Sequence, residues 1–232
     1  MTSIQPHKFS GIFNVVEDNR YWLSTRSLVP NQSVYGERIV KSDDGDYRIW
    51  TPRRSKLAAA IQKGMKEMPI QPGSRVLYLG ASTGTTVSHV SDIVGPTGIV
   101  YAVEFSPRVA RGLLRLSETR SNIVPIVEDA RHPDRYAAFV AGTIDVVYQD
   151  VAQPDQARIL YENLKSFCTY GAWGVLAIKA RSVDSTSKVD DVYRQESALL
   201  SQYGIEVQET VRLDPLEKDH AMAVCRVSEA LK

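Results

Sequence analysis

The chain has 232 residues, of which 43% are hydrophobic and 24% are charged, and its formal net charge is +1. These fractions are typical of a folded globular protein and exclude a disordered or fibrous chain. No stretch approaches the ~20 apolar residues of a membrane span, and the N-terminus lacks the apolar run of a secretion signal. Cys168 and Cys225 are too few for a disulfide framework or a zinc site. We therefore expect a cytoplasmic protein without a metal or a membrane contact, built as one full domain with a smaller appendage.

The charge is nearly balanced along the chain. Residues 1–56 hold nine Lys or Arg and six Asp or Glu, a balance of +3, and the remaining residues hold nineteen and twenty-one, a balance of −2. So small a basic excess is usual for a solvated surface. Composition alone therefore does not predict a nucleic-acid-binding protein.

Residues 1–53 read as short strands separated by turns. The β-prone runs cover residues 11–16, 21–25, 38–41 and 47–50. The Asp44-Gly45 step between the last two runs is a signal for a hairpin turn. Because Pro52 ends this pattern, we predict a small β-rich N-terminal domain over residues 1–53.

A helix is predicted directly after this region. Ser55 is a suitable N-cap. Leu57, Ile61, Met65 and Met68 then follow at helical spacing, which places them on one face. The pattern predicts that this helix extends as far as Met68.

From there the chain alternates between strands and helices. Strands are predicted at residues 75–79, 99–104, 123–127, 144–148, 174–179, 205–212 and 221–227. Helices are predicted at residues 108–119 and 155–167, each opened by a proline, and Gly204 suits a helix C-cap. The first five strands are short and almost continuously apolar, as in a parallel sheet buried on both faces. The last two have no helix between them, so we predict an α/β domain over residues 54–232 with a seven-stranded, mostly parallel sheet and an antiparallel last strand.

A glycine loop follows the first strand of this sheet. It reads Leu79-Gly80-Ala81-Ser82-Thr83-Gly84-Thr85-Thr86 and opens a helix. Such a loop presents backbone N–H groups at the edge where open α/β sheets bind ligands. The Gly-x-x-x-Gly spacing lacks the middle glycine of the dinucleotide fingerprint and the Walker lysine, which disfavours both of those ligands. By itself the loop also fits a tight turn that binds nothing.

Three successive strands of this sheet end in carboxylates. Glu104 follows the second strand, Asp129 the third and Asp150 the fourth. Glu104 lies twenty-four residues beyond Gly80, where an acidic side chain can accept both hydroxyls of an adenosine ribose. Asp129 can accept the adenine amino group. An adenosine ligand without phosphates that carries a cationic sulfonium fits this acidic crevice, so S-adenosylmethionine is the candidate cofactor and a class I, Rossmann-like methyltransferase is the expected fold.

Seven segments make the sequence resemble the fibrillarin family in its archaeal form. They are residues 54–61, 76–80, 84–96, 100–108, 150–154, 178–182 and 218–221. The run from Gly84 to Pro96 is long enough to be highly specific, whereas the first fifty residues are similar only in being a small β-rich domain. The family commonly has Ala-Ala-Ser-Gly in the glycine loop where this chain has Ala81-Ser82-Thr83-Gly84, a change between small residues.

The resemblance implies an activity and a set of partners. The activity is guide-directed transfer of a methyl group from S-adenosylmethionine to a ribose 2′-hydroxyl of ribosomal or transfer RNA. The chain would be the catalytic subunit of a box C/D ribonucleoprotein. Its partners would be the box C/D guide RNA, the substrate RNA, a Nop-family scaffold protein and a kink-turn-binding subunit that resembles a ribosomal protein.

The resemblance also implies site residues. The cofactor would contact Gly80, Ala81, Thr85, Thr86, Glu104, Phe105, Asp129, Ala130, Asp150, Val151, Ala152 and Gln153. The Lys-Asp-Lys-His tetrad of the family falls on Lys56, Asp150, Lys179 and His220. A helix start, two strand ends and the start of the last strand carry these four residues, so they can converge on one edge of the sheet.

The tetrad has a chemical rationale. Displacement at a sulfonium methyl needs an in-line oxygen nucleophile and a route for the proton of that oxygen, and positioning supplies most of the rate. Lys179 or Asp150 accepts the proton, directly or through water, and the sequence leaves both possibilities open. Taken singly, Lys56, Lys179 and His220 also fit ordinary surface or structural roles.

RNA contact is expected at the rim of the same edge. Arg53, Arg54 and Arg181, together with the two tetrad lysines, can form a positive rim for phosphates. We find no modular RNA-recognition motif. Binding without a guide should therefore be weak and salt-sensitive, with the choice of sequence delegated to a base-paired guide.

Three alternatives stay open at this point. The chain could methylate a protein side chain, such as a glutamine. It could serve mainly as a structural subunit that binds the cofactor and organises the guide complex. A nicotinamide oxidoreductase is a more distant alternative, because the spacing of the glycine loop disfavours it.

Overall fold

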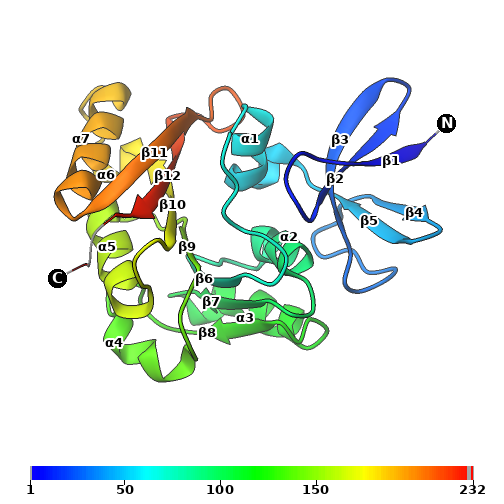
Figure 1. Cartoon of the computed structure of the whole chain (residues 1–232), viewed down its shortest axis with the longest axis horizontal. Helices are drawn as coiled ribbons and strands as arrows, with labels where there is room; N and C mark the ends of the chain where they lie inside the picture. The colour runs from blue at the N-terminus through cyan, green and yellow to red at the C-terminus, as the bar shows by residue number, and fades with distance from the viewer. Residues whose placement is uncertain (1, 229–230, 232) are drawn as a thin grey trace.

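The N-terminal sheet is antiparallel and has five strands. The computed structural model describes residues 2–228 and residue 231, and it places this sheet to one side of the molecule (Figure 1). In the order β1-β2-β3-β5-β4, the strands are β1 (Ser3–Pro6), β2 (Ile12–Glu17), β3 (Arg20–Arg26), β5 (Gly45–Ile49) and β4 (Ile39–Ser42). The predicted hairpin joins β4 to β5, with Ser42 opposite Gly45. Strand β1 was not predicted, because it is a short, mostly exposed edge strand without apolar alternation.

The second sheet has the seven predicted strands, with ends that shift by one or two residues. In the order β11-β12-β10-β9-β6-β7-β8, they are β11 (Ile205–Arg212), β12 (His220–Val227), β10 (Trp173–Lys179), β9 (Val146–Gln149), β6 (Arg75–Leu79), β7 (Ile99–Val103) and β8 (Ile123–Ile126). Strands β8, β7, β6, β9 and β10 pair in parallel. Strand β12 is antiparallel to both of its neighbours. The predicted α/β class with an antiparallel last strand is therefore confirmed.

Helices cover both faces of this sheet. They are α1 (Lys56–Gln62), α2 (Thr85–Val94), α3 (Pro107–Ser117), α4 (Pro133–Tyr136), α5 (Gln156–Phe167), α6 (Ala180–Val183) and α7 (Val189–Gln202), with 3₁₀ turns η1 (Pro52–Arg54) and η2 (Ala137–Phe139). Val76 and Tyr78 of β6 pack with α1, α2 and α3, whereas Leu77 and Leu79 pack with α5 and α7. Burial on both faces explains why the strand sequences are almost continuously apolar. Among the described residues, no helix combines the length and the apolar character needed to cross a bilayer.

Helix α1 is shorter than the predicted helix, which extended to Met68. Gly64 adopts a φ of +94°. Its N–H donates to the carbonyl of Ile61 over 3.1 Å, and the N–H of Met65 donates to the carbonyl of Ala60 over 3.0 Å. This pair of bonds is a Schellman motif, which ends the helix. Met65 and Met68 are buried as the spacing predicted, but beyond the end of the helix.

The order of the strands creates a crevice at one edge of the sheet. The chain goes from β6 to β7 and β8 on one side, and then returns to place β9 on the other side of β6. Ligands of open α/β sheets bind outside the carboxyl ends of the strands at such a switch point. The residues that follow β6 and β9 at this point are Gly80 and Asp150.

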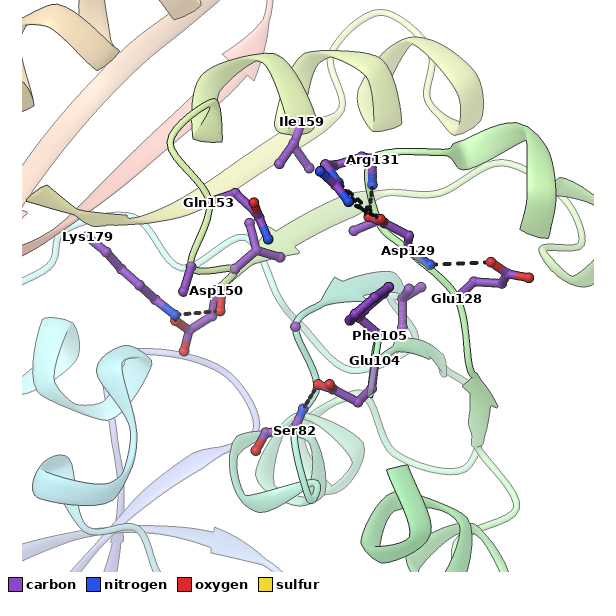
Figure 2. A pocket seen from close by; sticks show the side chains of 15 residues that line it. Ser82, Glu104, Phe105, Glu128, Asp129, Arg131, Asp150, Gln153, Ile159 and Lys179 are labelled. Atoms are coloured by element: carbon purple, nitrogen blue, oxygen red, sulfur yellow. Dashed lines mark hydrogen bonds and ion pairs between the residues drawn. The ribbon is translucent and has the colours of Figure 1, made fainter. Parts of the chain in front are cut away.

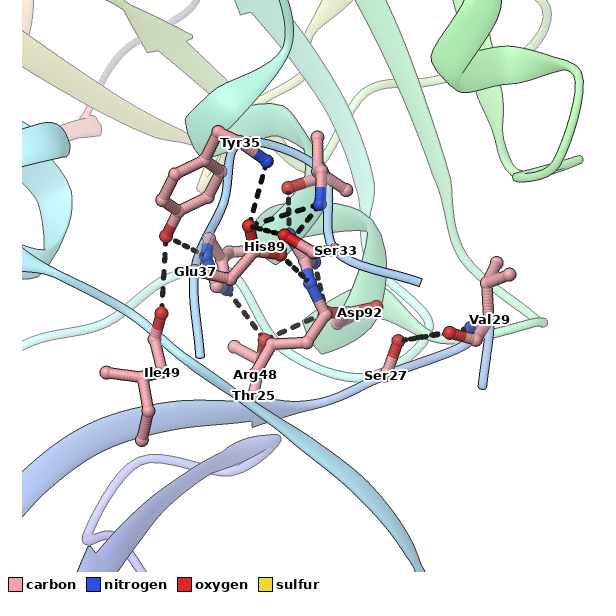
Figure 3. A network of polar contacts seen from close by, with 12 residues as sticks. Thr25, Ser27, Val29, Ser33, Tyr35, Glu37, Arg48, Ile49, His89 and Asp92 are labelled. Carbon is pink, nitrogen blue, oxygen red and sulfur yellow. Dashed lines mark hydrogen bonds and ion pairs between the residues drawn. The ribbon is translucent and has the colours of Figure 1, made fainter. Parts of the chain in front are cut away.

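A buried ionic network holds the N-terminal sheet against α2 (Figure 3). Arg48 of β5 is fully buried and donates to Glu37 over 2.6 Å and to Asp92 of α2 over 2.7 Å. Arg120 donates to the other carboxylate oxygen of Asp92 over 2.5 Å. Burial opposes ionisation of Glu37, but backbone N–H groups and the Arg48 guanidinium outweigh it and lower the pKa of Glu37 to about 2. Each charge thus has a partner, as buried ions require.

The same contact extends into a shared apolar core. Ile12 and Trp50 from the N-terminal region pack in one cluster with Leu57 of α1. The predicted domain boundary between residues 53 and 54 falls inside η1, and it stays a prediction.

His89 of α2 lies in the middle of this contact. Its Nδ1 atom lies 2.7 Å from the hydroxyl of Thr25, and its Nε2 atom lies 2.7 Å from the hydroxyl of Tyr35. The ring also stacks on Trp50, with 5.0 Å between the centroids. Burial, together with the guanidinium groups of Arg48 and Arg120, lowers the pKa of His89 well below its usual value of 6.5. The imidazole is therefore neutral in the folded protein at neutral pH.

We expect His89 to make the folded state less stable at mildly acidic pH. Below pH 6.5 the unfolded chain binds a proton on this histidine that the folded chain does not bind, so stability falls as pH decreases toward the folded pKa. The loss should be at most about 1.4 kcal/mol for each pH unit. Denaturant unfolding between pH 7 and pH 5.5 measures it.

His89→Gln should remove most of this pH dependence. His7→Gln is the comparison variant: burial and Lys8 also lower the pKa of His7, but less than that of His89 and outside the network, so this change should remove a smaller part of the pH dependence. A wild-type stability that stays constant over this pH range would contradict the prediction.

Candidate active site

A cavity of about 260 Å³ lies at the carboxyl ends of β6, β7, β8 and β9 (Figure 2). We call it the acidic lobe. Of the predicted cofactor residues, it is lined by Gly80, Glu104, Phe105, Asp129, Ala130, Asp150, Val151, Ala152 and Gln153. Its lining is completed by Ser82, Val103, Glu128, Arg131, Ile159 and Lys179. Segments that follow four different strands therefore meet at one place, as the parallel arrangement requires.

A second cavity of about 280 Å³ adjoins the first, and we call it the lysine lobe. It is lined by Arg54, Lys56, Tyr78, Ala81, Thr85 and Thr86. Both lobes share Gly80, Ser82, Asp150 and Lys179 in their lining. The two lobes are thus parts of one cleft, and every predicted cofactor residue lines one or both of them.

Gly80 lets the ends of β6 and β9 approach each other inside this cleft. It adopts a φ of +82°, in the region that favours glycine. A Cβ atom at this position would lie 2.7 Å from the carbonyl oxygen of Asp150 and 3.2 Å from the amide nitrogen of Val151. The position thus requires glycine for both its conformation and its lack of a side chain.

Glu104 is held in place by backbone groups. Its Oε2 atom accepts a hydrogen bond of 2.8 Å from the N–H of Ser82, and its Oε1 atom accepts one of 2.9 Å from the N–H of Ser106. Each carboxylate oxygen has a second lone pair, so the side chain can accept two further hydroxyl groups from the cleft. Beside it, residue Phe105 is 69% exposed at the wall of the acidic lobe, where a flat apolar group could stack on its ring.

Asp129 is paired with Arg131, a residue that the sequence reasoning missed. The Arg131 guanidinium lies 2.6 Å from Oδ2 of Asp129, and the Arg131 N–H donates to Oδ1 over 2.9 Å. These hydrogen bonds with Arg131 lower the pKa of Asp129. The Asp-x-Arg spacing was the available sequence signal.

The acidic lobe carries a negative net charge. Its lining holds the four carboxylates of Glu104, Glu128, Asp129 and Asp150 and the two cations of Arg131 and Lys179, a balance of −2. These groups thus favour a cationic ligand.

Lys56, Asp150 and Lys179 meet where the two lobes join. Lys56 Nζ lies 3.1 Å from Asp150 Oδ2. Lys179 Nζ forms an ion pair with Asp150 Oδ1 over 2.8 Å, and it donates a hydrogen bond of 2.8 Å to the backbone oxygen of Asp150. The exposed fractions of the three side chains are only 16% to 18%. One carboxylate thus lies between two ammonium groups in a largely water-excluded position.

Local structure positions Lys56. Ser55 caps α1 through its side chain, which accepts a hydrogen bond from the N–H of Ala58. The hydroxyl of Thr86 at the start of α2 donates to the Ser55 hydroxyl over 3.0 Å. The first turn of α1, and Lys56 with it, is thereby tied to the helix that follows the glycine loop.

His220 does not join this cluster directly. It lies opposite Lys179 in the β10–β12 ladder, and its Nδ1 atom lies 2.6 Å from the carbonyl oxygen of Lys218. Within residues 2–228 it makes no hydrogen bond to Lys56, Asp150 or Lys179. Three of the four predicted tetrad residues are therefore in contact, and the fourth is a neighbour across the ladder.

The three arginines of the predicted RNA rim occupy different places. Arg54 lines the lysine lobe, and its guanidinium lies 5.5 Å from the centroid of the Tyr35 ring. Arg181 is paired with Asp219 over 3.2 Å. Arg53 is exposed on η1 and lines neither lobe. Of the three, Arg54 alone reaches the cleft.

Comparison with known proteins identifies the family of this chain. A sequence model of the fibrillarin family matches residues 4–229. The chain belongs to the fibrillarin family. It is 51% identical over 225 residues to a protein of Thermococcus sibiricus named fibrillarin-like rRNA/tRNA 2′-O-methyltransferase, with 97% of this chain and 99% of that protein covered.

Solved structures of fibrillarins have the same fold. One is Aeropyrum pernix fibrillarin in complex with natively bound S-adenosyl-L-methionine, with a TM-score of 0.89 and 45% identity over 97% of this chain and 99% of that one. Another is fibrillarin in a fibrillarin/Nop5p complex, with a TM-score of 0.85 and 36% identity over 95% of this chain and 99% of that one.

We expect Gly80→Ala to be far more destabilising than Gly64→Ala. Both glycines have a positive φ, but a Cβ atom at Gly64 would meet nothing within 4 Å. Gly64→Ala should therefore lose about 1 to 2 kcal/mol of unfolding free energy from backbone strain alone. Gly80→Ala adds the contact with Asp150 and should lose about 2 to 5 kcal/mol. Denaturant unfolding of both variants tests this, and equal losses would show that the ends of β6 and β9 tolerate a methyl group between them.

Proposed function

We propose that this chain transfers a methyl group from S-adenosylmethionine to the ribose 2′-hydroxyl of guide-paired ribosomal or transfer RNA. The observation that carries the proposal is the continuous cleft, in which the acidic lobe opens onto the Lys56–Asp150–Lys179 cluster. The named activity of the Thermococcus relative and the bound cofactor of the Aeropyrum relative support it.

The acidic lobe fits the cofactor. Bound there, S-adenosylmethionine supplies a methyl group on a positively charged sulfur. Glu104 has free lone pairs for the ribose hydroxyls, and the exposed ring of Phe105 offers a stacking surface for adenine near Asp129. The net negative lining of the lobe matches the positive charge of the ligand.

The lysine lobe would hold the ribose that is methylated. The reaction joins the 2′-oxygen to the methyl carbon while the carbon–sulfur bond breaks, its electron pair stays on sulfur, and the hydroxyl proton leaves. Asp150, Lys56 and Lys179 lie at the junction of the lobes, where this exchange would take place. By holding both reactants in line, the cleft can supply a large part of the rate.

Asp150 is the better proton acceptor of the two candidates. A lysine ammonium has three donors and no lone pair, so it must lose a proton before it can accept one, whereas the carboxylate has free lone pairs. The two lysines orient this carboxylate and compensate its negative charge. Burial and the nearby carboxylate of Asp150 raise the pKa of Tyr78, so its hydroxyl stays neutral and is not an acceptor. We therefore assign proton acceptance to Asp150, directly or through water, and orientation to Lys179 and Lys56.

Asp150→Asn should lower kcat by about 10² to 10⁴, because the amide cannot accept the proton. Lys179→Arg keeps the positive charge beside Asp150 and should retain activity within about tenfold. Single-turnover methylation rates at several pH values measure both effects, with cofactor binding and unfolding temperature as controls for folding. An active Asp150→Asn variant, combined with an inactive but folded Lys179→Arg variant, would transfer the acceptor role to Lys179.

We also propose that the chain acts inside a larger assembly. The fibrillarin/Nop5p structure of a relative supports a Nop-family scaffold as one partner. The small net charge of +1 offers little general attraction for RNA, which supports delegation of target choice to a box C/D guide RNA and a kink-turn-binding subunit.

The deciding experiment measures transfer of labelled methyl groups to a guide-paired RNA, with and without the reconstituted scaffold, kink-turn subunit and box C/D RNA. A matched substrate carries a 2′-deoxy nucleotide at the target. We expect guide-dependent incorporation that disappears with the deoxy substrate. Labelling of a protein glutamine instead would favour a protein methyltransferase. A complete complex that binds the cofactor but transfers nothing would favour a structural subunit.

A further inference from the structure

Helix α3 carries a basic stripe on its exposed surface, formed by Arg108, Arg111 and Arg115. The three side chains are exposed, and their spacing of three and four residues places them on one face of the helix. Helix α3 contains no acidic residue. Within the described part of the chain, none of the three arginines takes part in an ion pair or a side-chain hydrogen bond.

The helix dipole favours Arg115, which lies in the last turn of α3, but it does not account for Arg108 or Arg111. Arg108 lies in the first turn of α3, where the partial positive charge of the helix N-terminus disfavours a cation. Arg111 and Arg115 are four residues apart, and like charges at this spacing repel each other. The first-turn position of Arg108 and the repulsion between Arg111 and Arg115 are therefore unfavourable in the isolated chain, and a polyanion bound along the stripe would relieve both.

The stripe is connected to the active cleft by a groove. A cavity of about 270 Å³ is lined by Arg115 and Gly112 of α3 and by Tyr35 and Thr85. Thr85 also lines the lysine lobe, and the Arg54 guanidinium lies over the Tyr35 ring. Basic groups thus run from the methylation cleft through Arg54 to Arg115 and along the face of α3, over about 10 Å of helix between Arg108 and Arg115.

The chemistry of this surface favours a phosphate backbone over a protein partner. Leu113 and Leu116 of α3 are buried in the core, and Leu114 is 45% exposed, which leaves little apolar surface for the centre of a protein interface. Guanidinium groups bind phosphate oxygens through paired N–H donors. Contacts of this kind fix the position of a nucleic acid without reading its sequence.

We propose that Arg108, Arg111 and Arg115 bind the phosphate backbone of the RNA strand that carries the target nucleotide. This inference rests on the proposed methyltransferase function and adds a surface outside the cleft and its rim. The stripe positions the strand along α3, and the groove at Tyr35 and Thr85 leads it to the lysine lobe.

The test compares three variants in the reconstituted complex. The first replaces Arg108, Arg111 and Arg115 with Gln, which removes three charges but keeps good helix formers. The second replaces the same residues with Lys, which keeps the charges. The control replaces Lys41, Lys188 and Arg194 with Gln and removes three exposed charges from β4 and from the start and the exposed surface of α7. The measured quantities are kcat and KM for the substrate RNA at several salt concentrations, the cofactor dissociation constant, and scaffold affinity without RNA.

We expect the Arg→Gln variant to raise KM for RNA about tenfold at low salt and to reduce the slope of log KM against log salt by about 2. Its kcat and cofactor affinity should stay within twofold of wild type, and the Arg→Lys variant should restore most of the RNA affinity. An Arg→Gln variant that behaves like the control would overturn the proposal. Loss of scaffold affinity with an unchanged salt slope would instead identify an acidic protein surface as the partner. Failure of the wild-type complex to methylate RNA would count against the proposed function, not against the stripe.

Discussion

The close approach of β6 and β9 at their carboxyl ends is the constraint on which the site depends. It is possible because Gly80 has no side chain, so the carbonyl oxygen of Asp150 can lie only 2.7 Å from the position that a Cβ atom would take. This contact joins the glycine loop to the segment that supplies Asp150, and the acidic and lysine lobes share both residues. The strand order makes the contact, because β9 returns to the side of β6 opposite β7.

The buried ionic network extends this constraint to the N-terminal sheet. Arg48 of β5 and Asp92 of α2 connect the sheet to the helix that begins directly after the glycine loop. At the other end of α2, Thr86 bonds to Ser55, whose neighbour Lys56 contacts Asp150. One helix therefore connects the N-terminal region to the cleft through direct contacts. Such buried networks are costly when a partner is missing, which makes the contact geometrically specific.

Acidic and basic side chains occupy different places around the cleft. Carboxylates dominate the acidic lobe, two ammonium groups flank Asp150 at the junction, and exposed guanidinium groups lie outside the cleft on α3. The acidic lobe thus suits a cationic cofactor, the junction suits a reaction in which one proton must leave, and α3 suits a polyanionic substrate. Because the cofactor is cationic and the RNA is polyanionic, the acidic lobe disfavours the RNA and the arginines of α3 disfavour the cofactor. The separation of charge therefore directs each ligand to its own surface.

The seven strands of the α/β sheet, helices α3 and α5, the glycine loop and the carboxylates at the strand ends follow from the sequence alone. Apolar periodicity and turn residues reveal them because they report burial and backbone geometry locally. The sequence also carried the family resemblance and the Lys56, Asp150 and Lys179 positions. The folded structure adds the end of α1, the short helices α4 and α6, the pairing of Arg131 with Asp129, and the absence of a hydrogen bond between His220 and the two lysines among the described residues. The reason is physical: Lys56 and Asp150 are 94 residues apart in the chain, and contacts over such distances depend on strand order and packing, which no local pattern encodes.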